Sequence, residues 1–202
     1  MDQVGVLSVG MMGVVLALLW LVVAPTAARA QGPRFVGRPG ASHLWLPPQM
    51  LATIRLVDSV FVPYEDAEYR RDLLGWYPAN AHARPYAVIA DFNGDGRQDV
   101  VVDGQSPSRI RRIVLLSGRS GFRALLLIDQ PRDVRAQPLS PATGQRTVYL
   151  SYVAPGRIDS SPELEDSALV LRHPAFEVGY WEQAGVLYYW DGQKFAEYVT
   201  GD

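Results

Sequence analysis

Oxygen-bearing side chains recur at alternate positions of one glycine-rich stretch of this sequence. With Asp91 counted as position 1, such side chains stand at positions 1, 3, 5 and 9, supplied by Asp91, Asn93, Asp95 and Asp99. Gly96 occupies position 6, and Arg97 offers its main-chain carbonyl at position 7. Calcium loops use oxygen ligands in this arrangement, with glycine at position 6 for a sharp turn. The spacing predicts a metal site formed by Asp91, Asn93, Asp95, Arg97 and Asp99.

The donor chemistry favours Ca²⁺ as the cofactor. Five oxygen donors in a flexible loop suit an ion that takes about six to eight ligands, whereas Mg²⁺ retains most of its water. The stretch offers no His or Cys, which zinc sites use. The alternative interpretation is an asparagine- and glycine-rich turn without metal, in which three acids would repel one another.

The residues around the loop exclude an EF-hand. That motif needs a bidentate acid at position 12, which is Val102 here, and it needs flanking helices. The segments Tyr86–Phe92 and Asp99–Asp103 are instead short runs rich in β-branched and apolar residues. Such runs are typical of strands. We therefore expect the loop to join two antiparallel strands.

The stretch Ala90–Val100 resembles one FG-GAP or VCBS-type repeat, the strand-loop-strand calcium motif of integrin α-subunit propellers and many exported bacterial proteins. The resemblance covers about residues 86–116. It implies calcium ligation by the four side chains named above and by the main chain of Arg97. The segment Tyr188–Phe195 also resembles small exported bacterial proteins that carry a single such repeat. A propeller needs at least about four four-stranded blades, so we do not expect a closed propeller.

The rest of the pattern predicts one mainly β domain, an antiparallel sheet or sandwich with one N-terminal helix packed on it. Further strands are expected at Arg112–Leu116, Phe122–Asp129, Thr147–Val153, Ala168–Arg172, Phe176–Glu182, Val186–Trp190 and Phe195–Thr200. Between Pro47 and Pro63, apolar residues recur every three or four positions, which predicts the amphipathic helix. A second, short helix is expected at Asp66–Leu74.

The N-terminal segment has a different composition. Val4–Val23 is almost entirely apolar and is followed by Ala28-Arg29-Ala30, a pattern typical of a signal peptide (residues 1–30) cleaved near Ala30. An uncleaved membrane anchor is the alternative, because about 20 apolar residues can span a bilayer. Residues 31–46 are expected to form an extended linker, leaving residues 47–202 as a single β-rich domain.

The composition limits the partners. The chain of 202 residues has a formal net charge of −2, and signal cleavage leaves it unchanged because Asp2 and Arg29 leave together. No basic field is available for nucleic acid. Cysteine is absent, so an exported chain has no disulfide and a metal ion is the cross-link available to it. We expect a periplasmic or extracellular protein with no membrane contact after cleavage.

Catalytic signatures are missing from the sequence. The histidines His43, His82 and His173 lie in no metal-ligand spacing, and no common hydrolase, metalloprotease or nucleotide motif occurs. Acids at Glu163, Glu165 and Asp166 could form a glycosidase pair, although a solvated loop is the simpler interpretation. We therefore expect a non-enzymatic calcium-binding domain in which the ion stabilises a β loop and supports a surface for a protein or glycan partner.

Aromatic residues near the C-terminus keep a second function open. Tyr188 and Trp190 share one face of their expected strand and Tyr189 lies on the other. With Tyr180 and Trp181 they form either core packing or a platform for sugar or peptide. The alternative function is a secreted hydrolase or a carbohydrate-binding module that acts on cell-wall or extracellular glycans.

Overall fold

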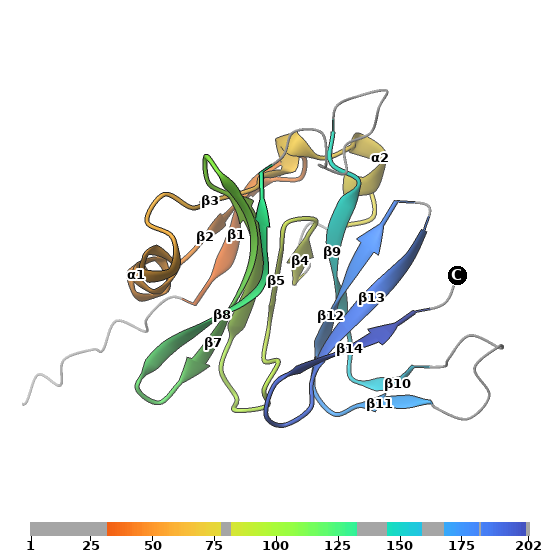
Figure 1. Ribbon diagram of the computed structural model, residues 1–202. Helices are drawn as coiled ribbons and strands as arrows, with labels where there is room; N and C mark the ends of the chain where they lie inside the picture. Colours follow the sequence, from red (N-terminus) through yellow and green to blue (C-terminus); the bar gives the residue numbers. More distant parts are fainter. Residues whose placement is uncertain (1–31, 78–81, 133–144, 159–167, 182, 201–202) are drawn as a thin grey trace, which may run out of the picture. The chain divides into compact units, whose positions relative to one another are not determined.

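The computed structural model describes residues 32–77, 82–132, 145–158, 168–181 and 183–200 (Figure 1). The first sheet has the strand order β4 (Ala83–Arg84), β5 (Ala87–Ala90), β6 (Asp99–Gln105), β7 (Arg109–Gly118) and β8 (Gly121–Pro131), and β3 (Val62–Pro63) pairs with the end of β6. The second sheet has the order β14 (Phe195–Val199), β13 (Gln183–Trp190), β12 (Ala175–Tyr180) and β9 (Val148–Val153). Separate hairpins pair β1 (Arg34–Arg38) with β2 (Ala41–Trp45), and β10 (Gly156–Ile158) with β11 (Leu169–Leu171).

All of these strand pairs are antiparallel. The prediction of a mainly β chain built from hairpins and strand-loop-strand units is confirmed. The described strands form no closed propeller, as expected.

The predicted N-terminal helix is confirmed as α1, Pro48–Val57, which contacts β7 and β8. Met50 and Ile54 are its buried residues, and burying side chains of this size stabilises by about 1.5–3 kcal/mol each. The helix ends at Val57, well before Pro63, and the backbone at Asp58 is extended. The Asp58 carboxylate forms an ion pair with Arg111 on β7, which fixes the helix end to the sheet.

The second expected helix is divided into two short pieces. A 3₁₀ turn, η1, covers Asp66–Glu68, and α2 covers Arg71–Leu74 and ends at Gly75. Tyr69 lies between them with an extended backbone, and its side chain is buried in the core.

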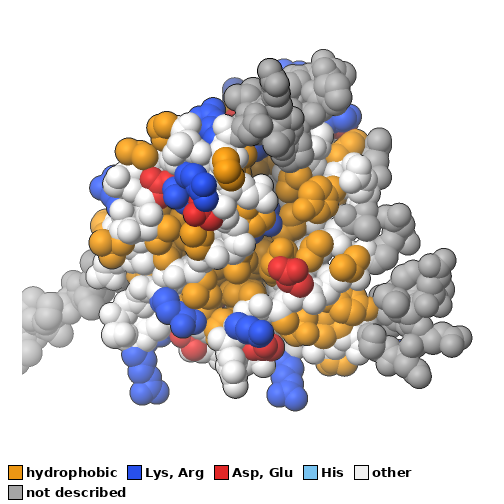
Figure 2. All heavy atoms as spheres, viewed as in Figure 1, with side chains coloured by type: hydrophobic (Ala, Val, Ile, Leu, Met, Phe, Trp, Pro, Cys, Tyr) orange, Lys and Arg blue, Asp and Glu red, His pale blue; other side chains and the backbone are white. Residues whose placement is uncertain are grey.

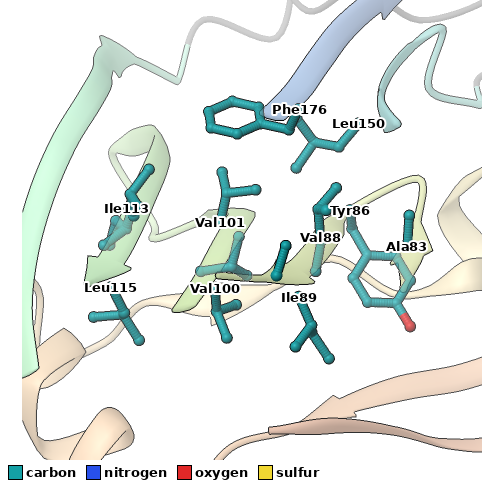
Figure 3. Close-up of a cluster of buried hydrophobic side chains, with 14 of the residues drawn as sticks. Ala83, Tyr86, Val88, Ile89, Val100, Val101, Ile113, Leu115, Leu150 and Phe176 are labelled. Carbon is teal, nitrogen blue, oxygen red and sulfur yellow. The ribbon is translucent and has the colours of Figure 1, made fainter. Parts of the chain in front are cut away.

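The central strands of the first sheet are buried on both faces. Figure 3 shows Val88 and Val101 on the side of the sheet that faces Phe176 and Leu150 of the second sheet. It also shows Ile89, Val100 and Leu115 on the opposite side, toward the N-terminal elements. This double burial explains why β5 and the valines at 100–102 of β6 read as continuous apolar runs and not as alternating ones.

The expectation of an extended linker over residues 31–46 is wrong for Arg34–Trp45, which forms the β1–β2 hairpin. The anchor is the buried carboxylate of Asp66. Its Oδ2 accepts hydrogen bonds from the Gly40 N–H at 3.0 Å, the Ser42 N–H at 3.0 Å and the Ser42 hydroxyl at 2.7 Å. Glycines that look like linker residues therefore serve a tight turn, with Gly40 at φ 83°.

A buried ion pair crosses the first sheet. Arg112 on β7 lies directly opposite Asp103 on β6, and its Nε and Nη2 reach the two carboxylate oxygens at 2.7 and 2.8 Å. Both side chains are almost fully buried. The pair fixes the register of the two strands, because a slip of one residue would leave both charges buried alone.

Several expectations lie outside the described residues. They are the signal peptide at residues 1–30, the acids Glu163, Glu165 and Asp166, and most of the connection over residues 130–144. In the part of the chain that the structure describes, no helix is long and apolar enough to span a membrane.

Candidate metal site

The predicted metal loop connects β5 to β6, as the sequence indicated. β5 ends at Ala90 and β6 begins at Asp99, and the two strands pair antiparallel with Ala90 opposite Asp99. Gly94 at φ 74° and Gly96 at φ 81° adopt the left-handed conformation that side chains disfavour. These glycines let the chain curl back toward Asp91 within a few residues.

Asp91 organises the loop through its carboxylate. Its Oδ1 accepts the N–H groups of Gly94 at 2.8 Å and Asp95 at 3.0 Å, and its Oδ2 accepts that of Gly96 at 2.7 Å. Three backbone donors thus point at one side chain. The side chain is also half-buried. The three hydrogen bonds hold this first predicted ligand in a fixed orientation.

The next two predicted ligands lie close to Asp91. The Asp95 N–H is shared between Asp91 Oδ1 and Asn93 Oδ1, each 3.0 Å from the nitrogen. Asp95 Oδ1 in turn accepts the Arg97 N–H at 3.0 Å. The structure therefore brings Asp91 and Asn93 together around one amide, with Asp95 on the exposed side of the same curl.

Asp99 is placed differently from the other three. Its side chain is fully buried, and it accepts hydrogen bonds from the Phe92 N–H at 3.0 Å and from Ser117 through both N–H at 2.7 Å and hydroxyl at 2.8 Å. Burial raises the pKa of this carboxyl to about 6, against the opposing effect of those hydrogen bonds. Asp99 thus ties the loop to the β7 strand end.

The acids of the loop are not gathered into one cluster. Among the described residues, no three His, Asp or Glu side chains lie close enough together to hold a metal ion. Two of the five predicted donors are an amide and a main-chain carbonyl. In a site of this composition, Asn93 and the Arg97 carbonyl contribute to binding the ion as much as the acids that accompany Asp91 do.

The loop contacts both large sheets. Phe92 is fully buried, with its ring 5.5 Å from that of Phe176 and 6.0 Å from that of Phe195, both in the second sheet. The imidazole of His173 covers the α carbon of Gly94. On the other side, Arg97 Nη1 donates to the Gly118 carbonyl of β7 at 2.9 Å. The loop therefore joins the end of one sheet to the core of the other.

Sequence reasoning missed two of these residues. His173 packs on Gly94 of the loop, and Ser117 holds Asp99. No sequence signal marks either one, because both are far from the loop along the chain. His43 and His82 are exposed.

The C-terminal aromatic residues divide between two faces as predicted. Tyr188 stacks on Phe176 with ring centroids 5.3 Å apart, and Trp190 packs against the same main core. Tyr189 packs with a separate small cluster that contains Leu187. Most of this aromatic surface serves packing between strands.

Comparison of the chain with protein-family models, with curated proteins and with solved structures finds no match.

Proposed function

We propose that this protein is a non-enzymatic, exported domain that binds one Ca²⁺ through its β5–β6 loop. In this proposal, β5, the loop and β6 form a single FG-GAP-like unit. Asp91, Asn93, Asp95 and Asp99 would hold the ion through side-chain oxygens and Arg97 through its carbonyl. The ion would supply positive charge between these oxygens and stiffen the loop, which supports a surface for a partner.

The observation that carries the proposal is the convergence of loop oxygens around the Asp95 amide. The Asp91 and Asn93 oxygens lie within 3.0 Å of the same nitrogen, on a backbone curled by Gly94 and Gly96. A hydrogen bond uses one lone pair of an oxygen acceptor and leaves another available to a cation. Asp95 stands at the exposed rim, where its carboxylate would complete the charge of the site.

The position of the loop gives the ion a structural consequence. The loop contacts Phe176 and Phe195 in the second sheet and Gly118 in the first. Stiffening it would therefore stabilise the junction of the two sheets. In an exported chain without cysteine, such a metal clip takes the place of a disulfide.

Thermal unfolding with calcium and with chelator tests the proposal. A ligand at 100 times its dissociation constant stabilises by about 2.7 kcal/mol. For a domain of this size we expect the melting temperature in calcium to exceed that in EDTA by about 5–10 °C. The Asp95→Ala variant should lose this difference, because it removes an exposed predicted ligand.

The matched control is Asp191→Ala. Asp191 is also an exposed aspartate in a β turn that accepts backbone N–H groups, but it has no neighbouring predicted ligands. This variant should keep the full calcium effect. Equal melting temperatures in calcium and EDTA for the wild type would overturn the proposal.

A further inference from the structure

A cavity of about 260 Å³ opens beside the loop, between the two sheets. Its walls come from the β5–β6 loop, from the β7–β8 hairpin and from one residue of β13. The lining residues are Asn93, Leu116, Ser117, Gly118, Ser120, Gly121, Phe122, Arg123 and Trp190. All of them belong to the described part of the chain.

The cavity combines aromatic and hydrogen-bonding groups. Trp190 and Phe122 are partly buried rings that pack against the main core from opposite sheets. Asn93 and Ser120 add an amide and a hydroxyl. Indole and phenyl faces with amide and hydroxyl groups suit a saccharide, whose ring has apolar C–H faces and an equatorial rim of hydroxyls.

The size restricts the ligand to about one ring. Ligand pockets for drug-sized molecules usually begin at about 300 Å³, and this cavity lies just below that. Figure 2 shows hydrophobic side chains gathered in the hollow between the strands of the two sheets, with basic and acidic side chains along its lower edge. A single ring could enter this hollow from solvent.

Two arginines make the hairpin side of the cavity suitable for an anion. Arg123 is in the lining, and the Arg97 guanidinium donates to the carbonyl of Gly118, another lining residue, at 2.9 Å. Arginine binds carboxylates in a planar, two-pronged geometry. The loop acids Asp91 and Asp95 lie on the Asn93 side of the cavity, away from the hairpin arginines, and Asp99 is buried and bonded to Ser117.

We propose that this cavity binds one saccharide ring that carries a carboxylate, a uronic acid residue of an extracellular glycan. The ring stacks on Trp190, its hydroxyls bond Asn93 and Ser120, and its carboxylate meets Arg123. The inference goes beyond calcium binding, with which it shares the side chain of Asn93.

Titration of the purified protein with galacturonic acid, galactose and acetate tests the inference, followed by calorimetry and by indole fluorescence. Each titration is run once in calcium and once in EDTA, so that a failure of calcium binding is recognised separately. We expect saturable binding of galacturonic acid, at least about tenfold tighter than that of galactose, because a charged hydrogen bond is added. The inference is overturned if galacturonic acid shows no saturable binding in either buffer. It is also overturned if acetate binds as tightly as galacturonic acid.

Two variants locate the site. Arg123→Gln changes an exposed residue and should weaken galacturonic acid binding about tenfold while galactose binding stays unchanged. Trp190→Leu should weaken the binding of both sugars about tenfold. The matched control is Arg119→Gln in the turn of the same hairpin, exposed and outside the lining, which should bind as the wild type does. Wild-type binding by Arg123→Gln, a variant with little reason to misfold, overturns the assignment even where Trp190→Leu does not fold.

Discussion

The turn between β13 and β14 and the loop between β5 and β6 both begin with an aspartate directly after a strand. In the shorter turn, Asp191 Oδ1 accepts the N–H groups of Gln193 at 2.8 Å and Lys194 at 2.9 Å, and Gly192 takes φ 106°. The chain reverses over four residues. One acid and one glycine are therefore sufficient to connect two strands of this protein.

The β5–β6 loop has the same beginning and much more polar content. Asp91 alone accepts three backbone N–H groups, which already closes the turn. Asn93, Asp95 and the buried Asp99 are additional. Chain reversal does not require Asn93 or Asp95, and the Asn93 oxygen lies with that of Asp91 around one amide. This difference between the two turns is the strongest structural argument for a cation at the longer one.

Removing the Asp99 carboxylate should have the largest effect on stability. Asp99→Ala leaves the donors of Phe92 and Ser117 buried without an acceptor, so we expect a loss of about 3–5 kcal/mol. Urea unfolding in EDTA measures it. Asp191→Ala, where the freed N–H groups bond water, should lose clearly less. Equal losses of stability in the two variants would show that Asp99 is no more important for stability than the turn aspartate Asp191.

The two acids should also respond to pH in opposite directions. Because burial raises the pKa of Asp99 to about 6, the folded state keeps its proton longer than the unfolded state. Its contribution to stability is full below about pH 4 and is lost as pH rises through about 6, by up to about 3 kcal/mol for two pKa units.

Asp191 has the reverse behaviour, because the Lys194 and Gln193 N–H groups lower the pKa of its carboxyl. Its contribution is present above the unfolded pKa and is lost as pH falls. Unfolding free energies in EDTA from pH 3.5 to 7, each compared with the Asn variant at the same position, check both signs. A difference between wild type and Asp99→Asn that does not change with pH would contradict the buried placement of Asp99.

A smaller effect separates the glycines of the two turns. Gly94, Gly96 and Gly192 all have positive φ, but an added methyl group at Gly94 would run into the His173 ring, whereas the other two face open space. We expect Gly94→Ala to destabilise by about 2–3 kcal/mol and the other two alanine variants by about 1 kcal/mol. Chemical unfolding provides the values. Three equal losses would mean that His173 does not pack on the loop.

The sequence predicts those parts of the fold that depend on residues close together in the chain, and it misses those that depend on distant residues. The strands around the loop and the helix after Pro47 follow from local periodicity, and their positions were predicted well. The β1–β2 hairpin was missed because its anchor, Asp66, lies 24 residues beyond Ser42 in the chain. A glycine- and proline-rich stretch without that anchor reads as a linker.

The candidate site shows the same limit. The alternation from Asp91 to Asp99 is local and gave the predicted ligands, but nothing in it shows that Asp99 turns inward to Ser117. The Arg112–Asp103 pair was also missed, because charges within strand patterns are expected to face solvent. Only the register of β6 and β7 shows that the two residues are opposite each other.

Calorimetric titration of the protein with Ca²⁺ tests the central claim most directly. The account predicts saturable binding of one Ca²⁺ per chain, lost in Asp95→Ala and retained in Asp191→Ala. Absence of binding to the wild type, or binding that Asp95→Ala leaves unchanged, would contradict it and leave the β5–β6 loop as a turn closed by hydrogen bonds alone.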